Sequence, residues 1–321
     1  MPPWLLGVLV AAYLVLVERK FLARLQIRYG PNRAGKFGLL QPIADAIKMM
    51  VKEDLVPAAA ERTIFLMAPA VVAFTALLMF AVVPFGSDVM VAGKKIPLVI
   101  SDLNVGLLFV FAMSSLGVYG VALGGWASNS KYSLLGGIRG AAQMISYELS
   151  LGLSLVPIAM LARSFSLVDI VNAQADYPFI LVAPVSFIIF IISAMAESKR
   201  IPFDLPEAEN ELGAGYHTEY SGMRFGLFFL GEYVHMQVLG ALTAVFFLGG
   251  WHGPLLPPWI WLLLKIIAIS LLMIWIRGTL PRLRYDQLMA FGWKRLIPIS
   301  LVWIVLSGVA IAIRRFGVPW S

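Results

Sequence analysis

The sequence predicts an all-α integral membrane protein with eight transmembrane helices, an amphipathic interfacial helix and long cytoplasmic loops. Composition gives the first indication, because 60% of the 321 residues are hydrophobic, only 13% are charged and the mean hydropathy is +0.85. A soluble domain carries about a quarter charged residues, so an ordinary soluble protein is excluded. The apolar residues also fall in long runs, and basic residues gather between alternate runs.

Eight apolar runs come close to the ~20 residues that cross a bilayer as a helix. We expect spans at roughly 2–17, 64–86, 104–124, 144–162, 179–196, 225–249, 258–276 and 296–313. The first run differs from a signal peptide, because its positive charges at Arg19 and Lys20 follow the apolar core. We therefore expect a retained first helix and one membrane domain over residues 1–321.

The basic residues orient these spans. Of the 25 Lys and Arg residues, 19 lie in the segments 18–63, 125–143, 197–224 and 277–295. The positive-inside rule places these loops in the cytoplasm and both termini outside.

The first inner loop contains a segment, 38–54, whose apolar residues recur with helical spacing. One helical face carries Leu40, Ile43, Ile47, Met50 and Val51, and the other carries Gln41, Asp45, Lys48 and Lys52. We expect an amphipathic helix that lies in the membrane interface, packs against the bundle or a partner, or does both.

The loop at 197–224 is acidic, whereas the other inner loops carry net positive charge. Its six acids are Glu197, Asp204, Glu207, Glu209, Glu211 and Glu219. Asp204 and Glu207 resemble a helix capping box with a proline in the first turn, which is a purely structural explanation. That explanation does not extend to Glu209, Glu211 or Glu219.

Ionisable residues also occur within the expected spans, at Glu148, Glu232 and Lys265. Such groups are costly in a bilayer, so they usually face a partner or a wet cavity. One alternative is a set of paired structural charges near helix ends. The other is a wet acidic path, formed by Glu148, Glu197, Glu232 and the loop carboxylates, because adjacent carboxylates with raised pKa values suit a proton relay.

Redox centres have no evident ligands in this chain. It contains no cysteine, which excludes disulfides and thiolate ligation of iron–sulfur clusters. Glu232 and His235 form one half of a di-iron carboxylate pattern, but the second half is missing. The expected topology places His217, His235 and His252 at three different depths, so it does not suit a bis-histidine haem.

Four long motifs carry a resemblance to a known family. They are RYGPNRAG with GLLQPIADAIKMMVKED, GIRGAAQMISYELSLGL, ESKRIPFDLPEAENELGAGYHTEYSGMRFGLFFLGEY and LPRLRYDQLMAFGWKRLIP. In this order, and over almost the whole chain, they resemble the H subunits of bacterial NADH:quinone oxidoreductase, or respiratory complex I, whose mitochondrial counterpart is NADH dehydrogenase subunit 1.

The resemblance implies a subunit of a proton-translocating enzyme of the bacterial inner membrane. It implies that the chain forms the quinone tunnel and the entry of an acidic proton channel, and that it binds no cofactor and no nucleic acid. Flavin, NADH and iron–sulfur clusters would belong to partner subunits. Those partners would be peripheral-arm iron–sulfur subunits and antiporter-like membrane subunits, with lipids and quinone as small-molecule neighbours.

The resemblance also implies roles for particular residues. Those implied to border the quinone tunnel are Glu18, Arg19, Arg24, Arg28, Arg200 and Phe203. Those implied in the proton path are Glu148, Glu197, Glu207, Glu209, Glu211 and Glu232. Those implied to face the peripheral arm are Arg139, Arg282, Arg284 and Asp286. No catalytic residue and no metal ligand is expected. A stand-alone ion transporter and the related subunit of a membrane-bound hydrogenase are the alternatives.

Overall fold

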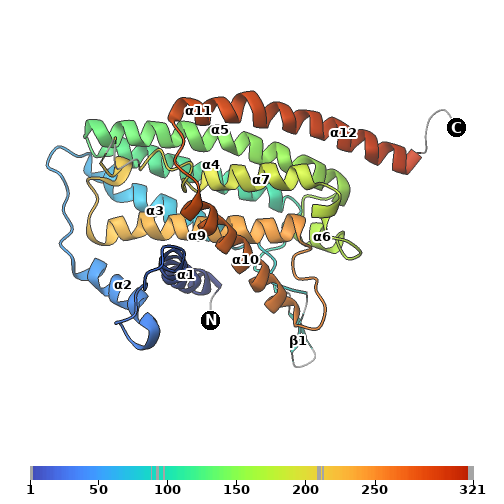
Figure 1. Ribbon diagram of the computed structural model, residues 1–321, viewed down its shortest axis with the longest axis horizontal. Helices are drawn as coiled ribbons and strands as arrows, with labels where there is room; N and C mark the ends of the chain where they lie inside the picture. Colours follow the sequence, from blue (N-terminus) through green and yellow to red (C-terminus); the bar gives the residue numbers. More distant parts are fainter. Residues whose placement is uncertain are drawn as a thin grey trace.

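The computed structural model describes residues 3–87, 89–91, 94–96, 98–207, 211 and 213–316. Its longer helices are α1 (Pro3–Leu25), α2 (Gln41–Val51), α3 (Arg62–Met79), α4 (Gly106–Ala127), α5 (Lys131–Ala162), α7 (Pro184–Glu197), α9 (Gly222–Phe247), α10 (Pro258–Thr279) and α12 (Ile297–Phe316). Shorter helices are α6 (Leu167–Asn172) and α11 (Tyr285–Phe291), and one antiparallel hairpin pairs β1 (Val89–Val91) with β2 (Lys94–Ile96). The protein is therefore essentially all-helical (Figure 1).

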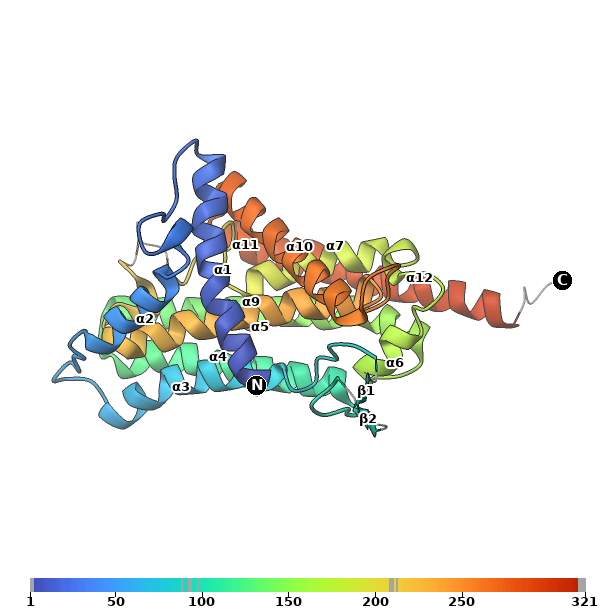
Figure 2. The ribbon, with the colours of Figure 1, turned by 90° about the horizontal axis from the view of Figure 1, so that it is seen from below.

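Helix α9 lies at the centre of the bundle. It packs against α1, α2, α3, α7 and α10, and most of its residues from Tyr233 to Phe247 are buried. Helices α3, α4, α5, α7 and α9 run alongside one another, whereas α1 crosses them steeply (Figure 2). Both sets cannot lie along one membrane normal, so at least one of them is strongly tilted in a bilayer.

Six helices among the described residues are long and apolar enough to cross a membrane. They are α3, α4, α5, α9, α10 and the continuous helix from Tyr285 to Arg314 that includes α11 and α12. The other two expected spans correspond to α1, whose last turns are charged, and to α7. Helix α7 has 14 residues and rises about 21 Å, less than the ~30 Å of a hydrocarbon core. The all-α membrane fold is confirmed, and the count of eight full-length spans is not.

The outward faces of these helices are apolar and exposed. Examples are Ile145 and Leu149 on α5, Ile267 on α10, and Val302 and Val305 on α12. A soluble monomer rarely exposes apolar surface of this extent, whereas lipid tails cover it without cost. Helix α12 is the least buried of the spanning helices and α9 the most, so the bundle has a protein-packed centre and a lipid-facing rim.

Helix α5 begins 13 residues before the expected start of its span, at Lys131, within the segment expected to be a loop. Two close contacts along this early part of α5 leave no room for a side chain. A Cβ on Gly125 would lie against the backbone of Ser133 and Gly137, and a Cβ on Gly136 would lie against the backbone of Gly215 and Tyr216. The glycines therefore allow α5 to approach α4 and the segment before α9 closely.

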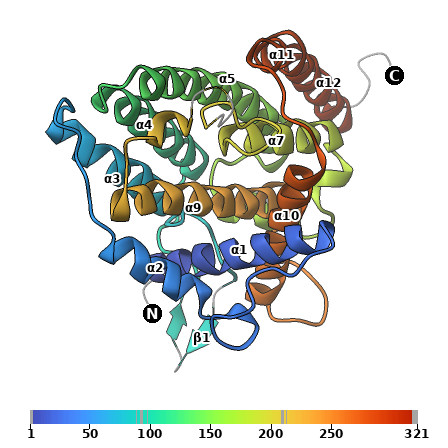
Figure 3. The same ribbon diagram turned by 60° about the vertical axis from the view of Figure 1, so that its left-hand side comes forward.

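Helix α1 extends eight residues past the expected end of its span and remains helical through Glu18, Arg19 and Arg24. The expected interfacial helix 38–54 is shorter in the structure, as α2 from Gln41 to Val51, preceded by a 3₁₀ turn at Lys36–Gly38. Figure 3 shows α1 and α2 next to one another along α9. This arrangement brings the charged end of α1 and the amphipathic helix to the same side of α9.

Candidate functional site

A cluster of four charged side chains, three of them largely buried and Arg277 about one-third exposed, joins α1, α9, α10 and the loop after α7. Arg200 Nη1 donates to both carboxylate oxygens of Glu18, at 3.1 and 3.2 Å. Arg200 Nε lies 2.7 Å from Glu232 Oε1, and Arg277 donates to Glu18 as well. Two carboxylates and two guanidinium groups balance in charge. Such a cluster is stable in a low-dielectric interior only while all its members are paired.

Local backbone geometry places Arg200 in this cluster. Helix α7 ends at Glu197, and Lys199 then adopts a left-handed φ of 54°. The resulting turn lets Lys199 and Arg200 both lie inside the protein, with only 5% and 4% of their surface exposed. Burial by itself lowers the pKa of Arg200, but Glu232, Tyr233 and Glu18 outweigh it and raise the pKa well above its ordinary value. Arg200 is therefore a permanent cation.

A second group of carboxylates contacts serine hydroxyls. The hydroxyl of Ser114 donates to Glu197, and the hydroxyl of Ser115 donates to Glu148. His235 Nε2 lies 3.3 Å from Glu197 Oε1. Serine hydroxyls both donate and accept hydrogen bonds, so these contacts suit an ionised or a protonated carboxyl group.

A third set of contacts lies in the loop before α9. Lys199 Nζ donates to the Tyr216 hydroxyl at 2.9 Å, and that hydroxyl donates to Glu207 Oε1 at 3.0 Å. Burial, with Glu207 as the next cause, raises the pKa of Tyr216 well above its ordinary value, so its hydroxyl keeps its proton. Glu207 is thus linked to Lys199 through one buried hydroxyl.

Asp204, in the same loop, pairs with Arg282 ahead of α11, with Oδ2 and Nη2 2.9 Å apart. Burial and the charge of Glu207 raise the pKa of Asp204 to about 7, although Arg282 opposes the change. The side chain is mostly buried, so desolvation outweighs the ion pair. Asp204 is consequently a carboxyl group that titrates near neutral pH.

Three spaces follow one another through this region. An apolar pocket of about 250 Å³ lies between α1, α2 and α9. It shares Arg19, Phe229 and Tyr233 with a charged chamber of about 360 Å³ that is lined by the Arg200 cluster and Glu207. The chamber shares Glu232 with a cavity of about 30 Å³, lined also by Lys199, Ser114, Glu197 and His235.

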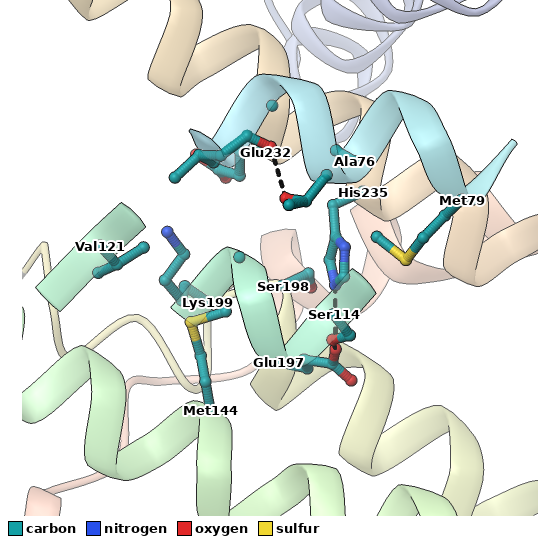
Figure 4. A pocket seen from close by; sticks show the side chains of 14 residues that line it. Ala76, Met79, Ser114, Val121, Met144, Glu197, Ser198, Lys199, Glu232 and His235 are labelled. Carbon is teal, nitrogen blue, oxygen red and sulfur yellow. Dashed lines mark hydrogen bonds and ion pairs between the residues drawn. The ribbon is translucent and has the colours of Figure 1, made fainter. Parts of the chain in front are cut away.

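The small cavity has room for a water molecule or two and has polar groups to bind them. Figure 4 shows His235, Ser114 and Glu197 close together on one side of it, while Lys199 extends toward the side where Glu232 lies. Water there would connect the ion-paired cluster with the serine-bonded carboxylates.

The structure brings together only part of the set expected to border the quinone tunnel. Glu18, Arg19 and Arg200 line the charged chamber. Arg24 and Arg28 are exposed, and Arg28 contacts Gln26. Phe203 is buried against Tyr147, with ring centroids 5.7 Å apart, and lies outside the chamber lining.

The residues expected in the proton path also separate. Glu207 and Glu232 line the chamber, Glu197 lines the small cavity, and Glu148 lies on α5 near α4 through Ser115. Glu211 is exposed and pairs with Arg139 at 2.7 Å. Glu209 lies outside the described residues.

Of the residues expected to face the peripheral arm, Arg139 pairs with Glu211, Arg282 with Asp204, and Arg284 with Asp286 at 3.2 Å. The last pair is strongly exposed.

Sequence reasoning missed several residues of the site: Lys199, Tyr216, Tyr233, Arg277 and Ser114. Arg277 follows the seventh expected span directly, where the sequence indicates only a basic loop. Its role depends on α10 crossing near Glu18, which no local pattern reveals. Lys199 and Tyr216 lie inside the acidic loop, and their cationic and hydroxyl groups among so many carboxylates were the available signal.

Comparison with known proteins identifies the family. The sequence model of the family described as NADH dehydrogenase matches residues 3–308. The second NADH-quinone oxidoreductase H subunit of Syntrophobacter fumaroxidans is 80% identical over 300 residues, which cover 94% of this chain and 91% of that protein. The second such H subunit of Geobacter sulfurreducens is 63% identical over 299 residues, covering 93% and 91%. The corresponding H subunit of Syntrophotalea carbinolica is 61% identical over 298 residues, covering 93% and 90%. The chain belongs to the NADH dehydrogenase family.

Proposed function

We propose that this chain is the membrane subunit of a proton-translocating NADH:quinone oxidoreductase that admits quinone from the bilayer and begins the proton path. The names of its relatives support this function. The observation that carries it is the sequence of three spaces, from apolar pocket to charged chamber to water-sized cavity, which share lining residues. A stand-alone transporter and a hydrogenase subunit are disfavoured by the same names.

The apolar pocket suits the tail of a quinone. Its lining residues Ala46 and Met50 on α2 are themselves exposed, so the pocket reaches the surface between α1 and α2. An isoprenoid tail is apolar and enters most easily from the hydrocarbon region of the bilayer. Tyr233 and Arg19 lie where the pocket meets the chamber, so they would be the first polar groups to meet the quinone head.

The chamber suits the polar head. Arg200 presents a buried Nη2 group with no hydrogen-bond partner among the described residues. A carbonyl oxygen of a quinone, or a water molecule, would satisfy it. Quinone reduction takes up two electrons and two protons. In this proposal flavin and iron–sulfur clusters of partner subunits supply the electrons, and the chamber carboxylates are coupled to the protons.

The proton path would leave the chamber at Glu232. From there it would run through water in the small cavity to His235 and Glu197, and then toward Glu148. Ser114 and Ser115 keep their contacts whether each carboxyl group holds a proton or not. Lys199, Tyr216 and Glu207 form a branch from the loop into the same cavity.

In this proposal the inner loops contact the partner subunits. The exposed pairs Arg139–Glu211 and Arg284–Asp286, with Arg282 nearby, would face the iron–sulfur subunits of the peripheral arm. Antiporter-like membrane subunits would contact the lipid-facing rim. The location would be the bacterial inner membrane, with these loops in the cytoplasm and both termini outside.

Narrowing the apolar pocket tests the quinone route. Ala46→Phe on α2 should raise the KM for a long-tailed quinone several-fold and affect a short-tailed analogue less, with NADH:ferricyanide activity unchanged. Ala44→Phe is the matched control, because Ala44 is exposed on the same helix but lies outside the pocket lining. Equal KM values for the two variants in assembled enzyme would argue against quinone entry here.

A further inference from the structure

A basic chamber of about 500 Å³ lies between α2 and the segment that leads into α9. Arg19, Lys48 and Lys52 line it, with Asp45 as the single acid. Arg19 and Asp45 form an ion pair of 2.8 Å. Within the part of the chain that the structure describes, neither lysine has an ion-pair partner. The chamber therefore carries excess positive charge that nothing in the described chain neutralises.

The rest of the lining combines hydrogen-bonding side chains, such as Thr218 and Ser221, with His217 and with apolar residues such as Phe225. The described carboxylates of the acidic loop do not line it. An anion in the chamber would thus meet two lysines and one arginine. It would be opposed by Asp45, which Arg19 already pairs, and from outside the lining by Glu207, whose Oε1 lies 3.8 Å from Nδ1 of His217.

The outer face of α2 next to this chamber is apolar. Ile43, Ile47 and Met50 are exposed, and Val51 is 80% exposed. A helix with this surface lies at the boundary of headgroups and acyl chains. Lysines on the adjoining face then lie at the height of lipid phosphates, where they attract anionic lipids.

The basic chamber also adjoins the apolar pocket. Both are lined by Arg19, Asp45 and Met49. A charged space and an apolar space that meet at the same residues are complementary to an amphiphile with an anionic head. A free inorganic anion would use only the first space, and a quinone, which has no charge, only the second.

We propose that this site binds an anionic phospholipid, with its phosphate between Lys48 and Lys52 and one acyl chain in the apolar pocket. The lipid chain then occupies the space that the proposed function gives to the quinone tail. The lipid site controls quinone access, a consequence that rests on the proposed function, whereas lipid binding itself does not.

The test uses the assembled enzyme in phosphatidylcholine nanodiscs that contain phosphatidylglycerol with a photoreactive group on its acyl chain. The expected label falls on segments of α1, α2 and α9 that line the apolar pocket. Lys48→Gln or Lys52→Gln alone should weaken the binding of phosphatidylglycerol about fivefold, and the double variant should weaken it about 30-fold. Lys48→Arg with Lys52→Arg should restore it.

The matched control is Lys131→Gln with Lys294→Gln, which removes two exposed lysines from other segments of the expected inner side and should leave labelling unchanged. Three results would overturn the proposal. Photoreactive phosphatidylcholine would label the pocket as strongly as phosphatidylglycerol does, millimolar phosphate would displace the phosphatidylglycerol, or the label would be absent from the pocket-lining segments of α1, α2 and α9. Labelling measures lipid binding, whereas the Ala46→Phe kinetics measure quinone turnover. Failure of the lipid site is therefore distinguishable from failure of the quinone route.

Discussion

Two groups of buried or half-buried carboxylates in this protein are held in different ways. Glu18 and Glu232 face the guanidinium groups of Arg200 and Arg277. Glu148 and Glu197 face serine hydroxyls, and Glu197 also faces His235. The two groups meet at the small cavity, where Glu232 and Glu197 both form part of the lining.

The difference lies in what each partner permits. A guanidinium group can only donate, so protonation of its carboxylate removes the ion pair and leaves a buried cation. A serine hydroxyl can donate to a carboxylate or accept from a carboxylic acid. The arginine-paired group is therefore suited to fix the shape and charge of the chamber, and the serine-bonded group is suited to pass protons.

Removing the central cation should have the largest effect. Arg200→Met leaves Glu18 and Glu232 buried with one cation fewer, and the cost should be roughly 3–5 kcal/mol of stability. We expect a strong loss of the chain from membranes and a lowered thermal midpoint of what remains. Arg284→Met, which breaks an exposed pair, serves as the control. A wild-type thermal midpoint for Arg200→Met would show that the charged cluster does not stabilise the fold.

Removing a serine-bonded carboxylate should spare assembly and impair function. Glu148→Gln keeps shape and hydrogen bonding but cannot titrate, so quinone reduction and proton translocation should fall together by about tenfold or more, typical of a lost proton-transfer group. NADH:ferricyanide activity should persist. Membrane vesicles allow all three to be measured, with Glu61→Gln at an exposed site as the control. Wild-type proton translocation in Glu148→Gln would show that protons do not pass through Glu148.

Asp204 tests an intermediate case, because it has one arginine partner yet its pKa is raised to about 7, by burial first and then by Glu207. In an unfolded chain this carboxyl group binds its proton far more weakly, with a pKa near 3.8. The stabilisation from the protonated form is thus fully present below that value and is lost as the pH rises through 7.

The non-titrating variant Asp204→Asn lacks this dependence. Relative to it, the wild-type protein should lose roughly 1 kcal/mol of stability between about pH 6 and about pH 8. Thermal midpoints of both proteins at the two pH values provide the measurement. A relative gain for the wild type over this range would mean that the Arg282 ion pair outweighs desolvation.

The smallest effect is expected at the surface. Glu211 is exposed and pairs with a partly exposed Arg139, so Glu211→Gln should change stability by less than about 1 kcal/mol. Its proton translocation should stay near wild type, in contrast to Glu148→Gln in the same vesicle assay. A loss as large as that of Glu148→Gln would extend the path to the exposed part of the acidic loop.

Much of the fold could be predicted because its signal is local. Runs of apolar residues predicted where α3, α4, α9, α10 and α12 lie, since a helix in lipid satisfies its backbone within one segment. Helix ends were harder to predict. The segment 125–143 was expected to be an inner loop because it lies between two apolar runs, although α5 already begins at Lys131. The charges at the end of α1 also indicate a loop, although Glu18 is buried by distant cations.

The sequence by itself determined that this is a membrane protein, which of its residues carry charge into the apolar region, and which family it resembles. Only the tertiary structure decided how those charges pair. Glu18 and Arg200 are 182 positions apart, and Glu18 and Arg277 are 259 apart. Glu148 and Glu232 looked alike in sequence, but one meets a serine and the other an arginine. The reason is physical: helix formation depends on neighbours in the chain, whereas the behaviour of a buried carboxylate depends on the groups that packing brings within a few ångströms.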